Sequence, residues 1–365
     1  MNYTNSTTRL APPARPTKAT PANVLTIIRD ARGVHLRLRR AATVARRGLR
    51  RAVACCALLT AALAASAEAQ NYSFNATAPA LDKWVYPFAS SGGGTRTSAP
   101  LFGAIGGTAG QFDDRNAQFF VGFNTSATVP AGRGAASYLI SSATLQLSLS
   151  ASVADLVVFD GSYDPISSYA ADGSALGGDA GRPVELYGAG YRNGFTALSV
   201  TETTGFSFGD PAIESTRNIF ATDHASGTAR DVSNNIRDRF DPTPFAIGQI
   251  AAADLNPDGT IKEGVVMTFT LNLANPDVLS YLQAALNAGR INLLATSLHP
   301  AAQGGPANRP EFDTKEMGLA GTPAALSLQV SVVPEPCAAS LAILGAAFIA
   351  GWRQRRVLLG KEDPS

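Results

Sequence analysis

The segment DLNPDGTIKEGV, which begins at Asp254, carries oxygen-bearing side chains at the spacing of a calcium-binding loop. Asp254, Asn256 and Asp258 take the first, third and fifth positions of an EF-hand loop, and Gly259 takes the sixth. The twelfth position should hold a bidentate carboxylate, but Val265 stands there. The Asn-Pro-Asp-Gly run is also typical of a tight turn, because Pro presets φ and Gly ends the turn. We therefore expect a hairpin turn before a strand, with a calcium site at these residues as the alternative.

Charge is distributed unevenly along the chain. The ends, residues 1–69 and 334–365, hold 16 of the 30 Lys and Arg and five of the 28 Asp and Glu, which leaves 14 and 23 in between, a net charge of −9. This excess of negative charge excludes nucleic-acid binding by phosphate neutralisation. It accords with calcium, because hard cations prefer carboxylates. Asp113 and Asp114 are a second candidate calcium site, unless they face solvent beside Arg115.

Two aromatic residues near the start of this middle segment are candidates for contact with a glycan. Trp84 and Tyr86 alternate on an expected first strand, so their rings share one face of that strand. A flat aromatic face can bind a sugar, but packing in the core uses the same residues. Trp84 is the single Trp of the middle segment, which weakens a multi-aromatic platform and favours the core.

No catalytic set of residues is evident in the sequence. Between the two ends the histidines are His224 and His299, and neither belongs to an H-E-x-x-H motif. The chain also lacks a phosphate-binding P-loop. The separation of two catalytic carboxylates cannot be read from a sequence. We therefore expect a non-catalytic protein and keep a glycan-active hydrolase as the least favoured class.

Short stretches of β-forming residues between Gly, Pro, Asn and Asp indicate a β protein. The expected strands share alternating or β-branched composition and cover residues 117–124, 138–150, 154–159, 196–200, 265–273, 291–297 and 325–333. Strands at such intervals predict a single antiparallel β-sandwich body over residues 70–331. The body contains no Cys, so packing alone must hold it together.

One helix is expected within the body. Residues 276–288 place Leu279, Leu282 and Leu286 on one face, with Asn275 as the N-cap, Pro at the first position and Gly289 at the stop. Residues 231–240 are a weaker helical candidate because they are few and precede a Pro.

The N-terminal 69 residues are typical of an export signal. A region rich in Arg is followed by an uncharged apolar run at residues 52–65 and then by the small residues ASAEAQ. Cleavage after Ala67 or after Ala69 fits this pattern, and we favour Ala69, which makes Gln70 the mature N-terminus. We expect a signal helix here, recognised by signal peptidase.

The C-terminal segment is more specific. A Pro-Glu-Pro triplet precedes uncharged residues 337–352, a cluster of arginines follows, and residues 357–365 form a short tail. The residues of this pattern are Pro334, Glu335, Pro336, Arg353, Arg355 and Arg356. The apolar run is short for a membrane span, but Trp352 suits the interface and the arginines suit the cytoplasmic side. We expect a transmembrane helix, and a plain membrane anchor is one explanation for it.

This segment, residues 332–356, closely resembles the PEP-CTERM sorting signal in motif, order and spacing. The resemblance implies recognition by an exosortase, a membrane transpeptidase that cuts near Pro-Glu-Pro and transfers the protein to an envelope component. It also implies a place on the outer surface or in the extracellular matrix of a polysaccharide-producing bacterium.

The body is similar to DNRLRE-type domains, which are assigned to a carbohydrate-binding module family. The phrases that carry the similarity are GFNTS at residues 122–126, SATLQL at 142–147 and PAALSLQV at 323–330. It departs from the pattern at Asn124, where Asp is usual, and by long insertions over residues 161–229. The resemblance implies a jelly-roll-like sandwich that binds or organises extracellular polysaccharide. The alternative is a structural or adhesive matrix protein without a specific glycan site.

Overall fold

The computed structural model describes most of the body and neither end. The described residues are 68–86, 96–103, 115–151, 156–169, 176, 181–205, 217–224, 229–299, 309–320 and 322–333. All of them belong to one compact unit, Ser66–Ala338. The expected signal helix with Ala67, the pair Asp113 and Asp114, and the sorting segment from Pro334 to Arg356 lie outside these residues. No helix within the described ranges is long and apolar enough to cross a membrane.

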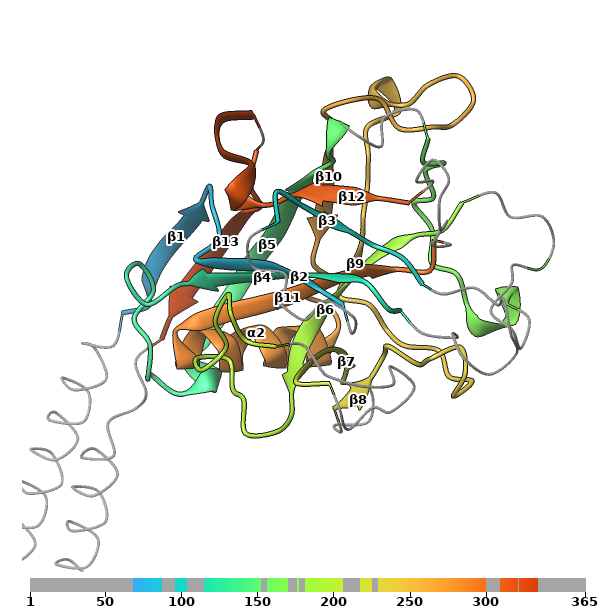
Figure 1. Cartoon of the computed structure of the whole chain (residues 1–365). Helices are drawn as coiled ribbons and strands as arrows, with labels where there is room; N and C mark the ends of the chain where they lie inside the picture. Colours follow the sequence, from blue (N-terminus) through green and yellow to red (C-terminus); the bar gives the residue numbers. More distant parts are fainter. Residues whose placement is uncertain are drawn as a thin grey trace, which may run out of the picture. The chain divides into compact units, whose positions relative to one another are not determined.

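The body is mainly β, as predicted, and its strands pair antiparallel throughout (Figure 1). The first sheet, sheet A, has the strand order β1-β13-β5-β10. Its strands are β1 (Gln70–Ala76), β13 (Ala325–Val332), β5 (Tyr138–Ser148) and β10 (Val266–Thr270). Apolar side chains alternate with polar ones along β13, where Leu326, Leu328 and Val330 are buried and the residues between them are exposed or half-buried. Because side chains alternate with a period of two residues, one face of the sheet points toward the core.

The second sheet, sheet B, has the order β2-β4-β11-β6-β7-β8, and β9 pairs with β6. Its strands are β2 (Leu81–Val85), β4 (Gln118–Asn124), β11 (Arg290–Ser297), β6 (Val184–Tyr191), β7 (Ile219–Asp223), β8 (Arg230–Asp231) and β9 (Ala246–Ile247). Most residues of β2, β4, β6, β7 and β11 are buried, so both faces of this sheet are covered. A small third sheet pairs β3 (Ser98–Pro100) with β12 (Glu311–Asp313).

The main core lies between sheets A and B. It contains inward residues of β13 and β5, such as Leu328 and Leu145, together with Phe119 of β4 and Leu293 of β11. The helix α2 (Pro276–Ala288) buries Val278, Leu282 and Leu286 in the same core. A second apolar cluster on the opposite face of sheet B includes Phe120, Tyr187 and Leu294.

The predicted helix is confirmed together with both of its ends. The Asn275 side chain accepts a hydrogen bond from the backbone N–H of Asp277 at 2.9 Å, and Pro276 follows the cap. Gly289 ends the helix with φ of 84°, a left-handed conformation that suits Gly. Val278 rather than Leu279 completes the buried face.

Two element predictions are wrong. Residues 196–200 form a turn rather than a strand, because Thr196 and Ser199 hydrogen-bond to each other's backbone. The expected helix at residues 231–240 is absent: Asp231 ends β8, residues 233–239 form successive turns, and Arg239 has a φ of 52°. Asp231 directs its carboxylate to the N–H of Ser233, which is local bonding that competes with a helix. Within the expected strand at residues 154–159, the described residues form one isolated β-bridge, between Val158 and Thr260.

Candidate functional site

The outward side of sheet A is an open surface made mostly of uncharged polar side chains, which we call the polar face. Its residues come from all four strands and are Asn71, Ser73, Asn75, Ser142, Thr144, Gln146, Thr268, Thr270, Ser327, Gln329 and Ser331. Strand pairing arranges them in rows across the sheet, and one complete row is Asn75, Ser327, Thr144 and Thr270. Neighbouring members of a row stand about 4.8 Å apart, the ordinary spacing of strands.

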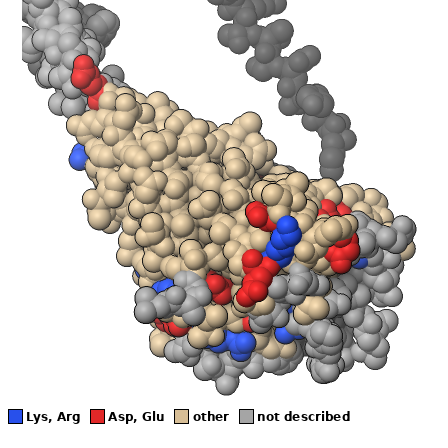
Figure 2. All heavy atoms as spheres, turned by 90° about the horizontal axis from the view of Figure 1, so that it is seen from above, with Lys and Arg blue, Asp and Glu red and all other residues tan. Residues whose placement is uncertain are grey.

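No residue of β1, β5, β10 or β13 is Asp, Glu, Lys, Arg or His. Some side chains of the polar face bond to each other, as Gln329 Nε2 donates to Ser73 Oγ at 2.9 Å and Ser331 Oγ donates to Asn71 Oδ1 at 2.5 Å. Exposed hydroxyl and amide groups therefore lie in rows across the sheet, with one register shift between Gln329 and Val330. In the view of Figure 2, most charged side chains gather toward one end of the described surface, and a broad expanse carries none.

The outward side of sheet B, which we call the covered face, lies beneath loops and contains buried charge. Arg115 Nη1 lies 2.5 Å from Glu185 Oε2, and both side chains are at most 2% exposed. Glu185 also accepts a hydrogen bond from the hydroxyl of Tyr187 at 2.9 Å, and Arg115 Nε donates to Asn235 Oδ1 at 2.9 Å. Burial raises the pKa of Glu185, although the positive charge of Arg115 acts to lower it.

A second group of charged residues surrounds Asp231 of β8. Asp231 Oδ2 is 2.7 Å from Arg192 Nη1 and 3.4 Å from Arg217 Nη1. Arg217 also donates to Asn234 Oδ1 at 2.7 Å. These contacts attach the segment after β8 to sheet B. Such networks constrain the loops that supply them.

The candidate aromatic contact for a glycan is part of the core. Trp84 is 8% exposed, and its indole N–H donates to the Pro100 carbonyl at 2.8 Å. Its ring stacks on Tyr86 with 4.6 Å between centroids, and the Arg96 guanidinium lies 4.4 Å from its centroid. Tyr86 is half-buried and meets Phe102 edge to face. Because its neighbours cover the Trp84 ring, this pair offers no open stacking platform.

The segment after Asp254 forms the expected tight turn. The backbone N–H of Gly259 donates to the Asn256 carbonyl at 3.0 Å, and Gly259 has a φ of 84°. Asp258 Oδ1 accepts hydrogen bonds from the N–H and the hydroxyl of Thr260, at 3.0 and 2.6 Å. Asp254 and Asp258 do not join a third acidic or histidine residue in the described part of the chain. Calcium binding by Asp254, Asn256 and Asp258 stays a prediction.

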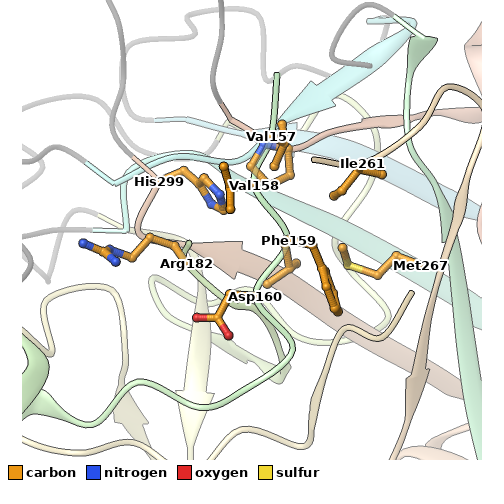
Figure 3. Close-up of a pocket in the computed structure, with 10 residues that line it drawn as sticks. Val157, Val158, Phe159, Asp160, Arg182, Ile261, Met267 and His299 are labelled. Atoms are coloured by element: carbon orange, nitrogen blue, oxygen red, sulfur yellow. The ribbon is translucent and has the colours of Figure 1, made fainter. Parts of the chain in front are cut away.

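His299 borders a pocket that Figure 3 shows, with Asp160 and Arg182 among its neighbours. Its Nδ1 lies 2.7 Å from the hydroxyl of Ser297, and Ser297 also donates to the Pro183 carbonyl at 2.9 Å. Burial, aided by the charge of Arg182, lowers the pKa of His299 to about 3, which keeps its ring neutral. The pocket is too narrow to hold a water molecule, so this Ser–His pair has no room for a substrate.

Three acidic residues from distant parts of the chain meet beside β2. Asp82 of β2, Glu202 of the turn after Val200 and Glu316 of the 3-10 helix η7 (Lys315–Ala320) have carboxylate oxygens within 4.8 Å of one another. Asp82 is fully buried, whereas Glu202 and Glu316 are partly exposed. Burial raises the pKa of Asp82 to about 7. We call these three residues the acidic cluster.

Two lysines adjoin the acidic cluster. Lys315 Nζ lies 3.7 Å from Asp82 Oδ1 and 3.9 Å from Glu316 Oε1, and it is hydrogen-bonded to Glu202. The buried Lys83 instead donates to the backbone carbonyls of Glu202 and Thr204. Sequence reading missed the cluster because its members lie more than a hundred residues apart, and no local motif surrounds any of them.

Comparison with protein-family models gives no match, and comparison with curated proteins gives none either.

Proposed function

We propose that the protein is exported, processed by signal peptidase and an exosortase, and displayed on the cell surface, where it binds or organises neutral extracellular polysaccharide without catalysis. The observation that carries the binding part is the polar face of sheet A, an exposed lattice of hydroxyl and amide groups with no charge. Glycan hydroxyls are both donors and acceptors, and Ser, Thr, Asn and Gln match them in both roles.

The spacing of the polar face supports an extended glycan. Strands lie about 4.8 Å apart, which is close to the length of one hexopyranose unit. A glycan chain that crosses the strands along the row Asn75, Ser327, Thr144 and Thr270 meets a polar side chain at each step. The absence of charge favours a neutral polymer, because an anionic one would find no cation here.

The boundaries of the fold support processing at both ends. β1 begins at Gln70, directly after the favoured cleavage point at Ala69, and β13 ends at Val332, two residues before Pro334. Gln70 and Val332 are paired in the ladder between these strands, so both proposed cleavage sites adjoin one corner of sheet A. Cleavage at Ala69 and near Pro334 would leave every strand intact.

The packed pair of sheets A and B supports the finer proposal of a jelly-roll-like sandwich of the carbohydrate-binding-module kind. The phrases at residues 142–147 and 323–330 fall on β5 and β13, the two inner strands of sheet A. The phrase at residues 122–126 covers the end of β4.

A structural or adhesive role is the second candidate, and two exposed apolar residues favour it. Leu139 is 53% exposed and Val266 is 39% exposed, and both stand on strands of sheet A. Apolar side chains on an open sheet are suited to contact with another protein.

Two experiments test the proposal. Mass spectrometry of the protein from its native envelope should find Gln70 at the N-terminus and a C-terminus near Pro334. An intact C-terminus at Ser365 would contradict exosortase processing. Affinity electrophoresis in gels that contain neutral or anionic polysaccharides should show retardation by a neutral one. Equal mobility in all of them would leave the adhesive role as the better explanation.

A further inference from the structure

We propose that the acidic cluster, Asp82, Glu202 and Glu316, is a binding site for a divalent cation, and that Ca²⁺ is the cation that fits best. This inference does not depend on the proposed function. The site differs from the turn at residues 254–258, which the sequence pattern suggested.

Buried oxygen atoms without hydrogen-bond donors are the first argument. Asp82 Oδ1, Glu202 Oε2 and Glu316 Oε2 are each buried and accept no hydrogen bond. Asp82 is the strongest case, since its side chain is 0% exposed. Its other oxygen accepts the N–H of Lys315 at 2.8 Å, which holds the carboxylate in place beside the other two members of the cluster. A buried carboxylate oxygen without a hydrogen-bond donor is costly, and a bound cation removes that cost.

The position of the Lys315 ammonium is the second argument. Its Nζ lies 3.7 Å from Asp82 Oδ1, 3.9 Å from Glu316 Oε1 and 3.4 Å from the Ala80 carbonyl oxygen, and it also contacts Glu202 Oε1. A cation therefore already occupies a point that oxygen atoms surround. The side chain of Lys315 is 28% exposed, so it can swing into solvent and leave this point to another cation.

The charge balance changes in favour of a divalent ion. Three carboxylates face one ammonium within the cluster, and Lys83 directs its own ammonium to backbone carbonyls. Replacement of the Lys315 ammonium by a doubly charged ion neutralises more of this negative charge. It also satisfies oxygens that a single lysine leaves without a partner.

The donor set selects the kind of ion. All three side chains supply oxygen, and hard cations prefer oxygen donors. Glu202 and Glu316 are 29% and 26% exposed, so one side of the site is open to water molecules that complete the coordination shell. Ca²⁺ accepts an irregular shell of carboxylates, carbonyls and water, whereas Mg²⁺ demands near-ideal octahedral geometry.

A bound ion would fasten three segments together. Asp82 belongs to the edge of sheet B, Glu202 to a turn that covers this sheet, and Glu316 to η7, which leads into β13. Ca²⁺ would therefore connect sheet B with a segment that leads into sheet A. We expect its main effect to be on stability.

Calorimetric titration of the metal-free full chain with CaCl₂, together with melting curves in Ca²⁺ and in chelator, tests the site. We expect heat of binding, a higher Tm in Ca²⁺ and a weaker response to MgCl₂. Lys315→Met should tighten Ca²⁺ binding about tenfold, because the competing ammonium is gone. Glu316→Gln should weaken binding by about tenfold or more through loss of one charged ligand. Asp82→Asn should abolish it, and Glu316→Gln covers the case in which Asp82→Asn does not fold.

Glu263→Gln is the matched control, because it removes one exposed carboxylate away from the cluster and should leave Ca²⁺ affinity unchanged. If neither the natural protein nor Lys315→Met shows heat or a rise in Tm, Lys315 is the permanent counter-ion and the proposal is wrong. It is equally wrong if Asp258→Asn, rather than Glu316→Gln, removes the response.

Discussion

The polar face of sheet A and the covered face of sheet B solve the same problem in opposite ways. Each sheet buries one side in the main core, and its other side must be either solvated or covered. Sheet A leaves that side open and lines it with uncharged groups that water solvates. Sheet B covers its other side with loops and buries ionic groups there, including Arg115 and Glu185.

The difference separates groups that fix the structure from groups that are available to a partner. A buried ion pair has desolvated charges that depend on each other, so it constrains the loops that supply them. The side chains of the polar face have solvent as their alternative partner, and little of the fold depends on them. Substitutions should therefore have contrasting effects on the two faces.

Breaking the ion pair on the covered face should have the largest effect on stability. Glu185→Ala leaves Arg115 buried without its carboxylate partner, and we expect unfolding to become easier by about 3–5 kcal/mol. Chemical denaturation measures this. The double variant Arg115→Met/Glu185→Leu should recover part of the loss. A single variant as stable as the natural protein would show that the pair does not hold the covered face.

Neighbouring positions on β13 should sharpen the contrast within sheet A. Leu328→Ala empties a fully buried position and should cost about 2–5 kcal/mol, whereas Gln329→Ala next to it should change stability by less than about 0.5 kcal/mol. Denaturation midpoints of the two variants give the comparison. Similar losses would mean that the polar face is part of the structural network.

The buried interior contains a titratable group, His299, whereas the strands of the polar face contain none. The folded protein holds the pKa of His299 at about 3, below its ordinary value of 6.5. Below pH 6.5 the unfolded chain binds a proton that the folded chain refuses, so His299 makes stability fall as the pH falls toward 3. The slope contributed by one such group is at most about 1.4 kcal/mol per pH unit. We expect His299→Gln to show a shallower loss of stability between pH 6 and pH 4, measured by denaturation at each pH.

Charge introduced on the polar face should have the smallest effect on stability and a clear effect on binding. Ser327→Lys and Gln329→Lys place ammonium groups at exposed positions, and we expect stability changes within about 0.5 kcal/mol. Retardation by neutral polysaccharide should decrease in affinity electrophoresis. Glu263→Lys, at an exposed position outside these strands, is the control and should keep the retardation.

The sequence predicted those elements whose signals are local. The helix α2 has its cap, its first-turn Pro and its terminal Gly within one short segment, and β5, β10, β11 and β13 lie where strands were expected. β6 was missed because Gly188 and Gly190 suggest a loop. In the structure, a side chain at Gly188 would collide with the ring of Tyr281, so this Gly permits close packing of the strand.

The candidate sites were harder to predict because they depend on tertiary contacts. The burial of Trp84 follows from Pro100 and Arg96, which approach it from outside its own strand. The acidic cluster requires a strand, a turn and a 3-10 helix to meet, and none of them signals the others in sequence. The alternation of polar and apolar residues along β5 already indicated one polar side of that strand. The extent of the polar face, however, depends on which strands become neighbours of β5.

The pairing of β13 between β1 and β5 has a mechanical consequence. In the proposed attached state, tension from the cell surface enters the fold at the end of β13, close to Val332. Force along this strand loads the ladders to β1 and β5 in shear, so their hydrogen bonds resist together rather than opening one after another. The strand next to the proposed attachment point is therefore hydrogen-bonded on both sides. A force applied to bound polysaccharide would pass through sheet A to the attachment point.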